Sequence, residues 1–265
     1  MLRLKSKQKL HGGINMTNQE LYNAIFKRKS IRKYNMTPLS QDKLAEIMEF
    51  ADNLKPLDGS IKYSFSFIGE NDARILLPLK LAPHYICLYS DKKDGYLMNA
   101  GYLLQQVDLF LSANNIGSCW LGMAKPNKDI PAQQDGLEFV IMLAFGNPAE
   151  KMYRENTSEF NRKSLSEISS IVGLDQVLEP VRLAPSAGNT QTWFFCGDEN
   201  EIIVRRMKLN LIKASLYGKL NPIDIGIALY HLWLSLDHEG KTAVYDFNKA
   251  DVPSGYEFMA KIKVI

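Results

Sequence analysis

The sequence has 265 residues, 46% of them hydrophobic and 23% charged, which is typical of one large or two smaller soluble globular domains. The net charge of +3 falls to −1 without Arg3, Lys5, Lys7 and Lys9, so a basic nucleic-acid surface on the body is not expected. No apolar run reaches the ~18 residues of a membrane helix, and we expect a cytoplasmic protein that binds neither nucleic acid nor membrane.

Residues 1–16 form a basic stretch that we expect to be a disordered tail, because it lacks the apolar run of a signal peptide. Thr17 and Glu20 form a capping box that begins a first helix, and a second helix follows residues 37–40. Apolar patterns predict strands at 61–67, 84–90 and 137–145. Residues 97–115 predict a helix that is apolar nearly all round and therefore central.

The order of elements recurs after a polar connector at 149–163. Ser164 and Glu167 form another capping box, and Pro180 interrupts a helix predicted at 174–184. The remaining patterns predict a second long apolar helix at 223–238 and strands at 193–196, 201–206, 241–247 and 256–265.

Short motifs also recur at nearly constant offsets. Leu54-x-Pro56-x-x-Gly59 and Leu183-x-Pro185-x-x-Gly188 lie 129 residues apart. Asn99-Ala100-Gly101 and Asp224-Ile225-Gly226 lie 125 residues apart and open the two central helices. Several matches in one order favour an internal duplication. We therefore predict an α+β fold with two related halves, 17–163 and 164–265, each with a mixed, mainly antiparallel sheet packed on a long central helix.

Metal binding and nucleophilic catalysis have little support in the sequence. Cys87, Cys119 and Cys196 lie in apolar stretches and are interpreted as reduced core thiols. The four histidines are scattered, so no metal ligands are assigned. The sequence lacks G-x-S-x-G, a Walker loop and the G-x-G-x-x-G fingerprint, and no catalytic residue is assigned.

Three short segments contain residues suited to a phosphate and a flat polar ring. Arg28, Ser30 and Arg32 can bind phosphate oxygens, although a solvated basic face is the alternative. Residues 185–189, Pro-Ser-Ala-Gly-Asn, let a planar ligand approach the backbone, although such a turn also ends a helix. Residues 117–122 are either a ring contact or a helix C-cap followed by a buried Trp.

Taken together, these motifs resemble the FMN-dependent nitroreductase family. The resemblance lies in Arg28-Lys29-Ser30-Ile31-Arg32-Lys33-Tyr34, residues 116–122 and 143–148, Arg162-Lys163-Ser164-Leu165, and residues 184–193. In the usual family member the serine–asparagine turn follows the basic motif by a few tens of residues. Here residues 54–64 occupy that place without the signature, which appears in the second half instead. The chain thus resembles the branch in which two halves are fused into an intrachain pseudo-dimer.

The resemblance implies one intact flavin site per chain, made by both halves. The phosphate would be bound by Arg28, Ser30, Arg32 and Arg162 or Lys163, and Lys29 would reach the ring edge. The ring would contact Pro185, Ser186, Ala187 and Asn189, and the backbone at Trp120, Leu121 and Gly122. The second half lacks both the basic opening motif and a Trp-Leu-Gly segment.

The implied activity is an FMN-dependent oxidoreductase that uses NAD(P)H as co-substrate and reduces an electron-poor acceptor such as a nitroaromatic or a quinone. The alternative is a non-catalytic flavin-binding module for storage or redox sensing. A fused pseudo-dimer is expected to be a monomer or a weak homodimer.

Overall fold

The computed structural model describes residues 16–75, 81–131 and 133–265. The first half of the chain is built around one main β-sheet. The sheet has the order β1-β3-β7-β4 with antiparallel neighbours, and β6 pairs with the start of β7. The strands are β1 (Tyr63–Gly69), β3 (His84–Ser90), β4 (Gly117–Leu121), β6 (Gln133–Gln134) and β7 (Leu137–Gly146). A separate short pair joins β2 (Ala73–Arg74) to β5 (Lys125–Pro126), next to the 3-10 turn Glu70–Asp72.

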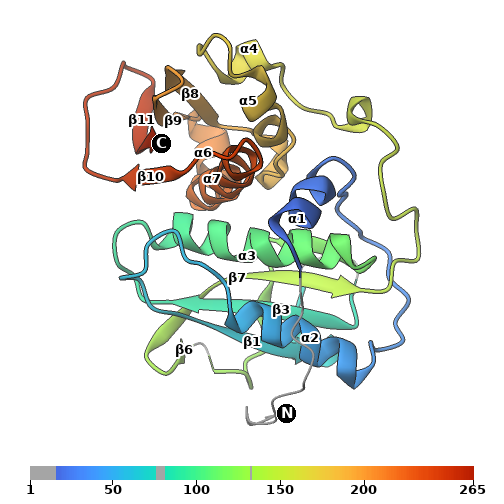
Figure 1. Cartoon of the computed structure of the whole chain (residues 1–265). Helices are drawn as coiled ribbons and strands as arrows, with labels where there is room; N and C mark the ends of the chain where they lie inside the picture. The colour runs from blue at the N-terminus through green and yellow to red at the C-terminus, as the bar shows by residue number, and fades with distance from the viewer. Residues whose placement is uncertain (1–15, 76–80, 132) are drawn as a thin grey trace.

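Helix α3 (Tyr96–Ala113) lies along this sheet, and α1 (Asn18–Ile25) and α2 (Gln41–Asp52) complete the helices of the first half (Figure 1). The predicted capping box is present at the start of α1, where the Thr17 side chain accepts from the Glu20 backbone N–H. Ser40 caps α2 in the same way, through the N–H of Lys43.

The second half repeats this plan with a sheet of order β10-β11-β9-β8, again antiparallel. Its strands are β8 (Trp193–Gly197), β9 (Glu201–Met207), β10 (Ala243–Asp246) and β11 (Tyr256–Val264). Its helices are α4 (Leu165–Ile168), α5 (Asp175–Arg182), α6 (Leu211–Tyr217) and α7 (Asn221–His238), with a 3-10 turn at Ala187–Asn189. Another 3-10 turn, Thr157–Glu159, lies in the connector before α4. Figure 1 shows α7 packed on α3, so the two long helices form the middle of the molecule.

Both central helices are buried nearly all round, as their composition predicts. Fifteen of the 18 residues of α3 and 14 of the 18 residues of α7 are buried, so neither helix has a solvent face along most of its length. Polar residues inside them, such as Asp108 and His231, must therefore find partners within the protein.

The contact between α3 and α7 is reciprocal. A Cβ atom on Gly101 would lie 2.0 Å from the carbonyl oxygen of Ile223, and one on Gly226 would lie 1.9 Å from that of Met98. Met98 and Ile223 are 125 residues apart, as are Gly101 and Gly226. A two-fold relation between equivalent halves produces such exchanged contacts, which supports the duplication that the sequence predicts.

The first turn of each central helix also holds a turn of the same half. The Asn99 side-chain oxygen accepts from the N–H groups of Leu57 and Asp58 at 2.8 and 3.1 Å. The Asp224 carboxylate accepts from the N–H of Ala187 at 2.9 Å. Asp58 and Ala187 are the recurring turn positions 129 residues apart, so the motif repeat corresponds to a repeated contact.

The α+β architecture with antiparallel sheets around two long helices is confirmed, and the strand at 84–90 has the predicted bounds. All strand pairs in the two sheets are antiparallel, and parallel pairing occurs only in two isolated bridges of the described chain, Ser30 with Ser118 and Ser169 with Phe195. Residues 117–122 contain the edge strand β4, so the helix C-cap alternative for them is wrong, because α3 already ends at Ala113; the ring contact stays a prediction. Helix α6 is not among the predicted elements, and it buries no residue: its large apolar side chains Leu211, Ile212 and Leu216 are exposed.

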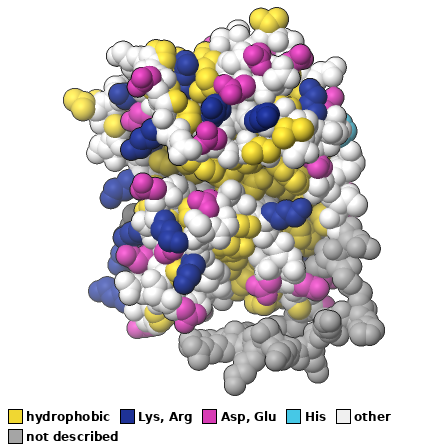
Figure 2. Space-filling view, turned by 60° about the vertical axis from the view of Figure 1, so that its left-hand side comes forward, with side chains coloured by type: hydrophobic (Ala, Val, Ile, Leu, Met, Phe, Trp, Pro, Cys, Tyr) yellow, Lys and Arg dark blue, Asp and Glu magenta, His cyan; other side chains and the backbone are white. Residues whose placement is uncertain are grey.

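The expectation for residues 1–16 falls almost wholly outside the described residues, and the boundary between the halves at 163 and 164 stays a prediction. Figure 2 shows apolar side chains gathered in a band between the two halves, with charges of both signs above and below it. Across the described ranges, no helix is both long enough and apolar enough to cross a bilayer.

Candidate functional site

A cavity of about 550 Å³ lies where the two halves meet. Three segments line it: the stretch after α1, the connector that follows β7, and the turn after α5. Its lining residues are Arg28, Lys29, Ser30, Arg32, Arg154, Glu159, Asn161, Arg162, Pro185, Ser186, Gly188 and Asn189. The structure thus brings Arg28, Ser30 and Arg32 into one cavity with Arg162 and most of the predicted ring turn, although more than 150 residues separate Arg32 from that turn in sequence.

The basic segment is held in place by the edge of the first sheet. After α1 ends, the chain runs beside β4, where the N–H of Ile31 donates to the carbonyl of Ser118 at 2.8 Å. Ile31 is fully buried, and Gly117 makes room for it, because a Cβ there would lie 2.9 Å from the Ile31 side chain. Anchoring Ile31 fixes where Arg28 and Ser30 enter the cavity wall.

Arg28 is buried and paired, which is unusual for an arginine at a ligand cavity. Its side chain is 2% exposed, and its Nε lies 2.5 Å from Oδ2 of the fully buried Asp108. Its Nη2 donates to Ser30 Oγ at 3.0 Å. Within the described chain these bonds leave Arg28 Nη1, and the whole guanidinium of the exposed Arg32, as donors for an anion.

Two further arginines raise the positive potential of the cavity. Arg154 packs its guanidinium 4.0 Å from the ring centroid of Phe160 and donates to the Arg28 carbonyl. Burial and the charges of Arg28, Arg154 and Arg182 lower the pKa of Arg162 to about 9. A bound anion would offset this repulsion between like charges, so the cluster fits a phosphate group.

The turn after α5 is held in place by hydrogen bonds to Arg162 of the connector. Gly188 has a φ of +56°, the left-handed region that glycine adopts without strain. Asn189 Oδ1 accepts from Arg162 Nη1 at 2.8 Å, and Arg162 Nε donates to the Ala184 carbonyl at 2.9 Å. Arg162 therefore links the turn to the connector, and at least two of its N–H donors are already bonded to protein acceptors.

Five predicted residues do not line the cavity: Trp120, Leu121, Gly122, Lys163 and Ala187. Lys163 Nζ donates to the Gln191 carbonyl at 3.0 Å, and the backbone N–H of Ala187 donates to the Asp224 carboxyl group. The space beside Gly122 is taken by Leu220, and that beside Gly188 by the ring of Tyr217. In this structure the last residue of α6, Tyr217, and the residue just before α7, Leu220, thus make the close approaches that the resemblance implies for a flavin ring.

Arg154 is a cavity residue that the sequence reading missed. It lies in the connector, which was interpreted only as polar and charged, and no motif marks it. Only the fold brings it beside Arg28. Lys29, predicted to reach the ring edge, also lines the cavity, but its Nζ donates to the Lys151 carbonyl at 2.8 Å.

A second cavity, of about 280 Å³, includes in its lining the residues that the predicted repeat equates with 183–186. It lies against the degenerate turn at residues 54–57, and its lining includes the rings of Tyr102, Tyr230, Trp233 and Tyr245. Trp233 stands 125 residues after Asp108, the buried carboxylate that pairs with Arg28 of the first cavity. Among the described residues the only cation in its lining is Lys55, so this cavity lacks an arginine cluster for phosphate.

Comparison with known proteins identifies relatives of the whole fold. The family model described as "Putative TM nitroreductase" matches residues 20–236. A Thermotoga maritima protein described as a "putative nitroreductase" has a similar structure, with a TM-score of 0.60 and 20% identity over 98% of this chain and 99% of that one. A search of curated proteins finds no sequence match.

Two further structures match smaller parts of the chain. A nitroreductase family protein from Clostridium novyi NT covers 51% of this chain and 87% of its own, with 21% identity and a TM-score of 0.41. An FMN-dependent nitroreductase from Clostridium difficile R20291 covers 54% of this chain and 93% of its own, with 20% identity and a TM-score of 0.40.

Proposed function

Because the chain belongs to the family described as "Putative TM nitroreductase", we propose that it is an FMN-dependent oxidoreductase. In this proposal it takes electrons from NAD(P)H and passes them to an electron-poor acceptor such as a nitroaromatic or a quinone. The observation that carries the proposal is the arginine-lined cavity at the junction of the two halves.

The residues of this cavity fit the phosphate of FMN. Arg28 and Arg32 offer charged donors, and Ser30 and Arg154 stand beside them. Burial is the main cause of the lowered pKa of Arg162, and the charges of neighbouring arginines add to it; a dianionic phosphate would relieve this second, repulsive part. A cavity of about 550 Å³ is also within the range of cofactor pockets, ~300–1,000 Å³.

The protein's contribution is to bind and orient. Arg28, Ser30 and Arg32 would hold the phosphate, while Ser186 and Asn189 would place polar groups at the ring end of the cavity. FMN, when bound, would accept hydride from a reduced nicotinamide and supply electrons to the acceptor. No protein nucleophile or general acid is needed for this chemistry, which agrees with the absence of a nucleophile–base pair in the sequence.

The direct test is the binding of FMN to purified protein and to two variants. Arg28→Ala combined with Arg32→Ala should weaken FMN binding at least ~100-fold, because two charge-assisted contacts are lost. Arg74→Ala, an exposed arginine of β2 outside the cavity, is the matched control and should bind FMN like the unmodified protein. Full FMN occupancy in the double variant would refute the phosphate assignment.

Turnover separates the reductase from a flavin-storage or sensing module. Steady-state oxidation of NADH and NADPH is followed at 340 nm with a quinone and then with a nitroaromatic acceptor. Acceptor-dependent oxidation supports the reductase. Stoichiometric FMN with no acceptor-dependent oxidation would favour the non-catalytic module.

A further inference from the structure

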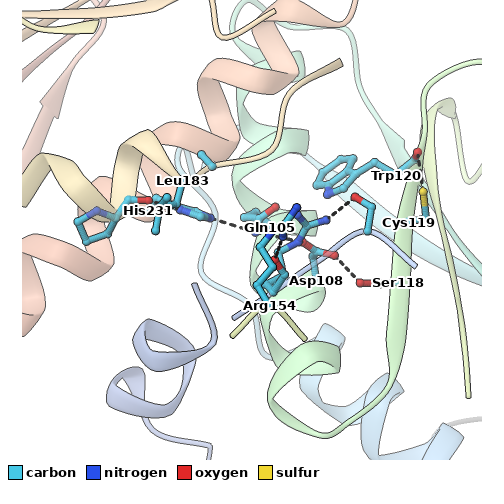
Figure 3. Close-up of polar contacts among 12 residues, drawn as sticks. Gln105, Asp108, Ser118, Cys119, Trp120, Arg154, Leu183 and His231 are labelled. Carbon is cyan, nitrogen blue, oxygen red and sulfur yellow. Dashed lines mark hydrogen bonds and ion pairs between the residues drawn. The ribbon is translucent and has the colours of Figure 1, made fainter. Parts of the chain in front are cut away.

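A line of buried polar side chains leads from the arginine cluster into the second half of the chain (Figure 3). Asp108 and Gln105 stand on α3, one turn apart, and His231 faces them from α7. Gln105 Nε2 lies 3.2 Å from Asp108 Oδ2 and 3.2 Å from His231 Nε2. His231 Nδ1 lies 2.8 Å from the carbonyl oxygen of Pro180 in α5. All three side chains are fully buried.

The chemistry of the partners gives these hydrogen bonds one direction. A carbonyl oxygen only accepts, so His231 Nδ1 carries a hydrogen and donates to Pro180. Burial lowers the pKa of His231 to about 4, so at neutral pH its Nε2 is an acceptor. The two hydrogens of Gln105 Nε2 then go to His231 and to Asp108. Each donor along the line has a defined acceptor.

The carboxylate of Asp108 is held from three sides. Ser118 Oγ donates to Oδ1 at 2.5 Å, while Gln105 Nε2 and Arg28 Nε both donate to Oδ2. A carboxylate with three donors in a buried site has little freedom to turn. The guanidinium of Arg28, a cavity-lining residue, is fixed in turn, with Nε on Asp108 and Nη2 on Ser30.

The far end of the line reaches the helix that carries the ring turn. Helix α5 contains Pro180 and ends just before Leu183 and Ala184, whose carbonyls accept from Arg162. The turn at residues 185–189 follows directly. The line therefore connects the phosphate side of the cavity, in the first half, to the ring side, in the second half.

We propose that Asp108 and Gln105 are positioning residues for the phosphate-binding arginine: Asp108 aims the Arg28 guanidinium, and Gln105, held by His231, fixes Asp108. This inference rests on the proposed function. A purely electrostatic role of Asp108 makes the opposite prediction, because its negative charge opposes a bound phosphate. Removing that charge would then strengthen phosphate binding, whereas loss of positioning weakens it.

The test compares the affinities of FMN and riboflavin, which differ only in the phosphate. Asp108→Asn keeps the shape of the side chain and removes its charge. We expect the ratio of FMN affinity to riboflavin affinity to fall about ten-fold or more in this variant. A general loss of structure would lower both affinities together and leave the ratio unchanged. An unchanged or increased ratio in Asp108→Asn would overturn the proposal.

A milder pair of variants guards against misfolding of Asp108→Asn. Gln105→Leu should lower the same ratio about three-fold. Gln106→Leu is the matched control, because Gln106 is the adjacent buried glutamine of α3 but bonds to the Lys55 backbone at the second cavity. Equal ratios in the two glutamine variants would also overturn the proposal. If the unmodified protein does not prefer FMN over riboflavin, the phosphate assignment of the proposed function itself fails.

Discussion

Replacing Gly226 with alanine should push the two central helices apart. A Cβ at this position would lie 1.9 Å from the Met98 carbonyl oxygen, whereas ordinary contact begins at about 3.4 Å. The two backbones would have to separate by about 1.5 Å at this point. Because α3 and α7 are both buried along most of their length, neither helix can move into solvent to relieve the clash, and the separation disturbs close-packed neighbours.

The magnitude follows from two opposing terms. Overpacking a close-packed interface costs ~1–3 kcal/mol, and the better helix propensity of alanine returns ~0.5–1 kcal/mol. The net loss should be ~1–2 kcal/mol, which for a chain of this size is a fall in Tm of ~2–8 °C. Gly101→Ala should cost a similar amount, since its contact with Ile223 is the reciprocal one. The double variant should lose less than the sum, because one separation relieves both clashes.

Urea and thermal unfolding, followed by circular dichroism, measure these differences. Gly59→Ala is the control, because a Cβ there meets nothing within 4 Å, and its stability should stay within ~0.5 kcal/mol. If Gly226→Ala and Gly101→Ala are as stable as the unmodified protein, the close reciprocal contact of the two helices is wrong. Full additivity in the double variant would contradict the shared interface.

Three further predictions address the site and the core. Burial raises the pKa of the Asp224 carboxyl to about 7, so its contribution to stability is fully present below pH ~4 and is lost as the pH rises through 7. The variant Asp224→Asn should therefore flatten the pH dependence of the urea unfolding midpoint between pH 5 and pH 8. An unchanged pH profile in this variant would count against the raised pKa. FMN titration should saturate at one per chain, because the second cavity lacks an arginine cluster among the described residues, whereas two per chain would show a second site. Burial raises the pKa of Cys87 to about 12, so a thiol reagent should label it only as fast as the protein unfolds, and rapid labelling of the native protein would refute its burial.

Local sequence signals were sufficient for most elements of this fold. The capping box at Thr17 and the apolar run at 84–90 each act within a few residues, and both elements are present as predicted. Strand β4 was missed because Gly117-Ser-Cys-Trp-Leu121 has little strand character of its own. It is a strand because β7 lies beside it and because Gly117 accommodates Ile31.

The candidate site was predicted in part. The basic segment and the turn at 185–189 contain residue types that suit phosphate and a planar ring, and both line one cavity. Trp120, Leu121 and Gly122 carry an equally suggestive motif but lie outside it. Arg154 has no motif and lies inside it. A sequence motif shows which chemical groups a segment carries. Whether those groups line a cavity depends on how the other segments of the chain pack around them.

Periodicity and charge are properties of residues close in sequence, so the central position of both apolar helices and the basic motif at residues 28–32 could be predicted from the chain alone. The division into two halves was predicted from motifs that recur at nearly constant offsets. The burial of Arg28 against Asp108, and the hydrogen bonds through Gln105 and His231 that continue from this pair to α5, become visible only in the folded chain. Buried polar groups must be satisfied wherever the fold places them. Their partners are therefore set by helix packing over distances of 80 and 126 residues, which no local pattern records.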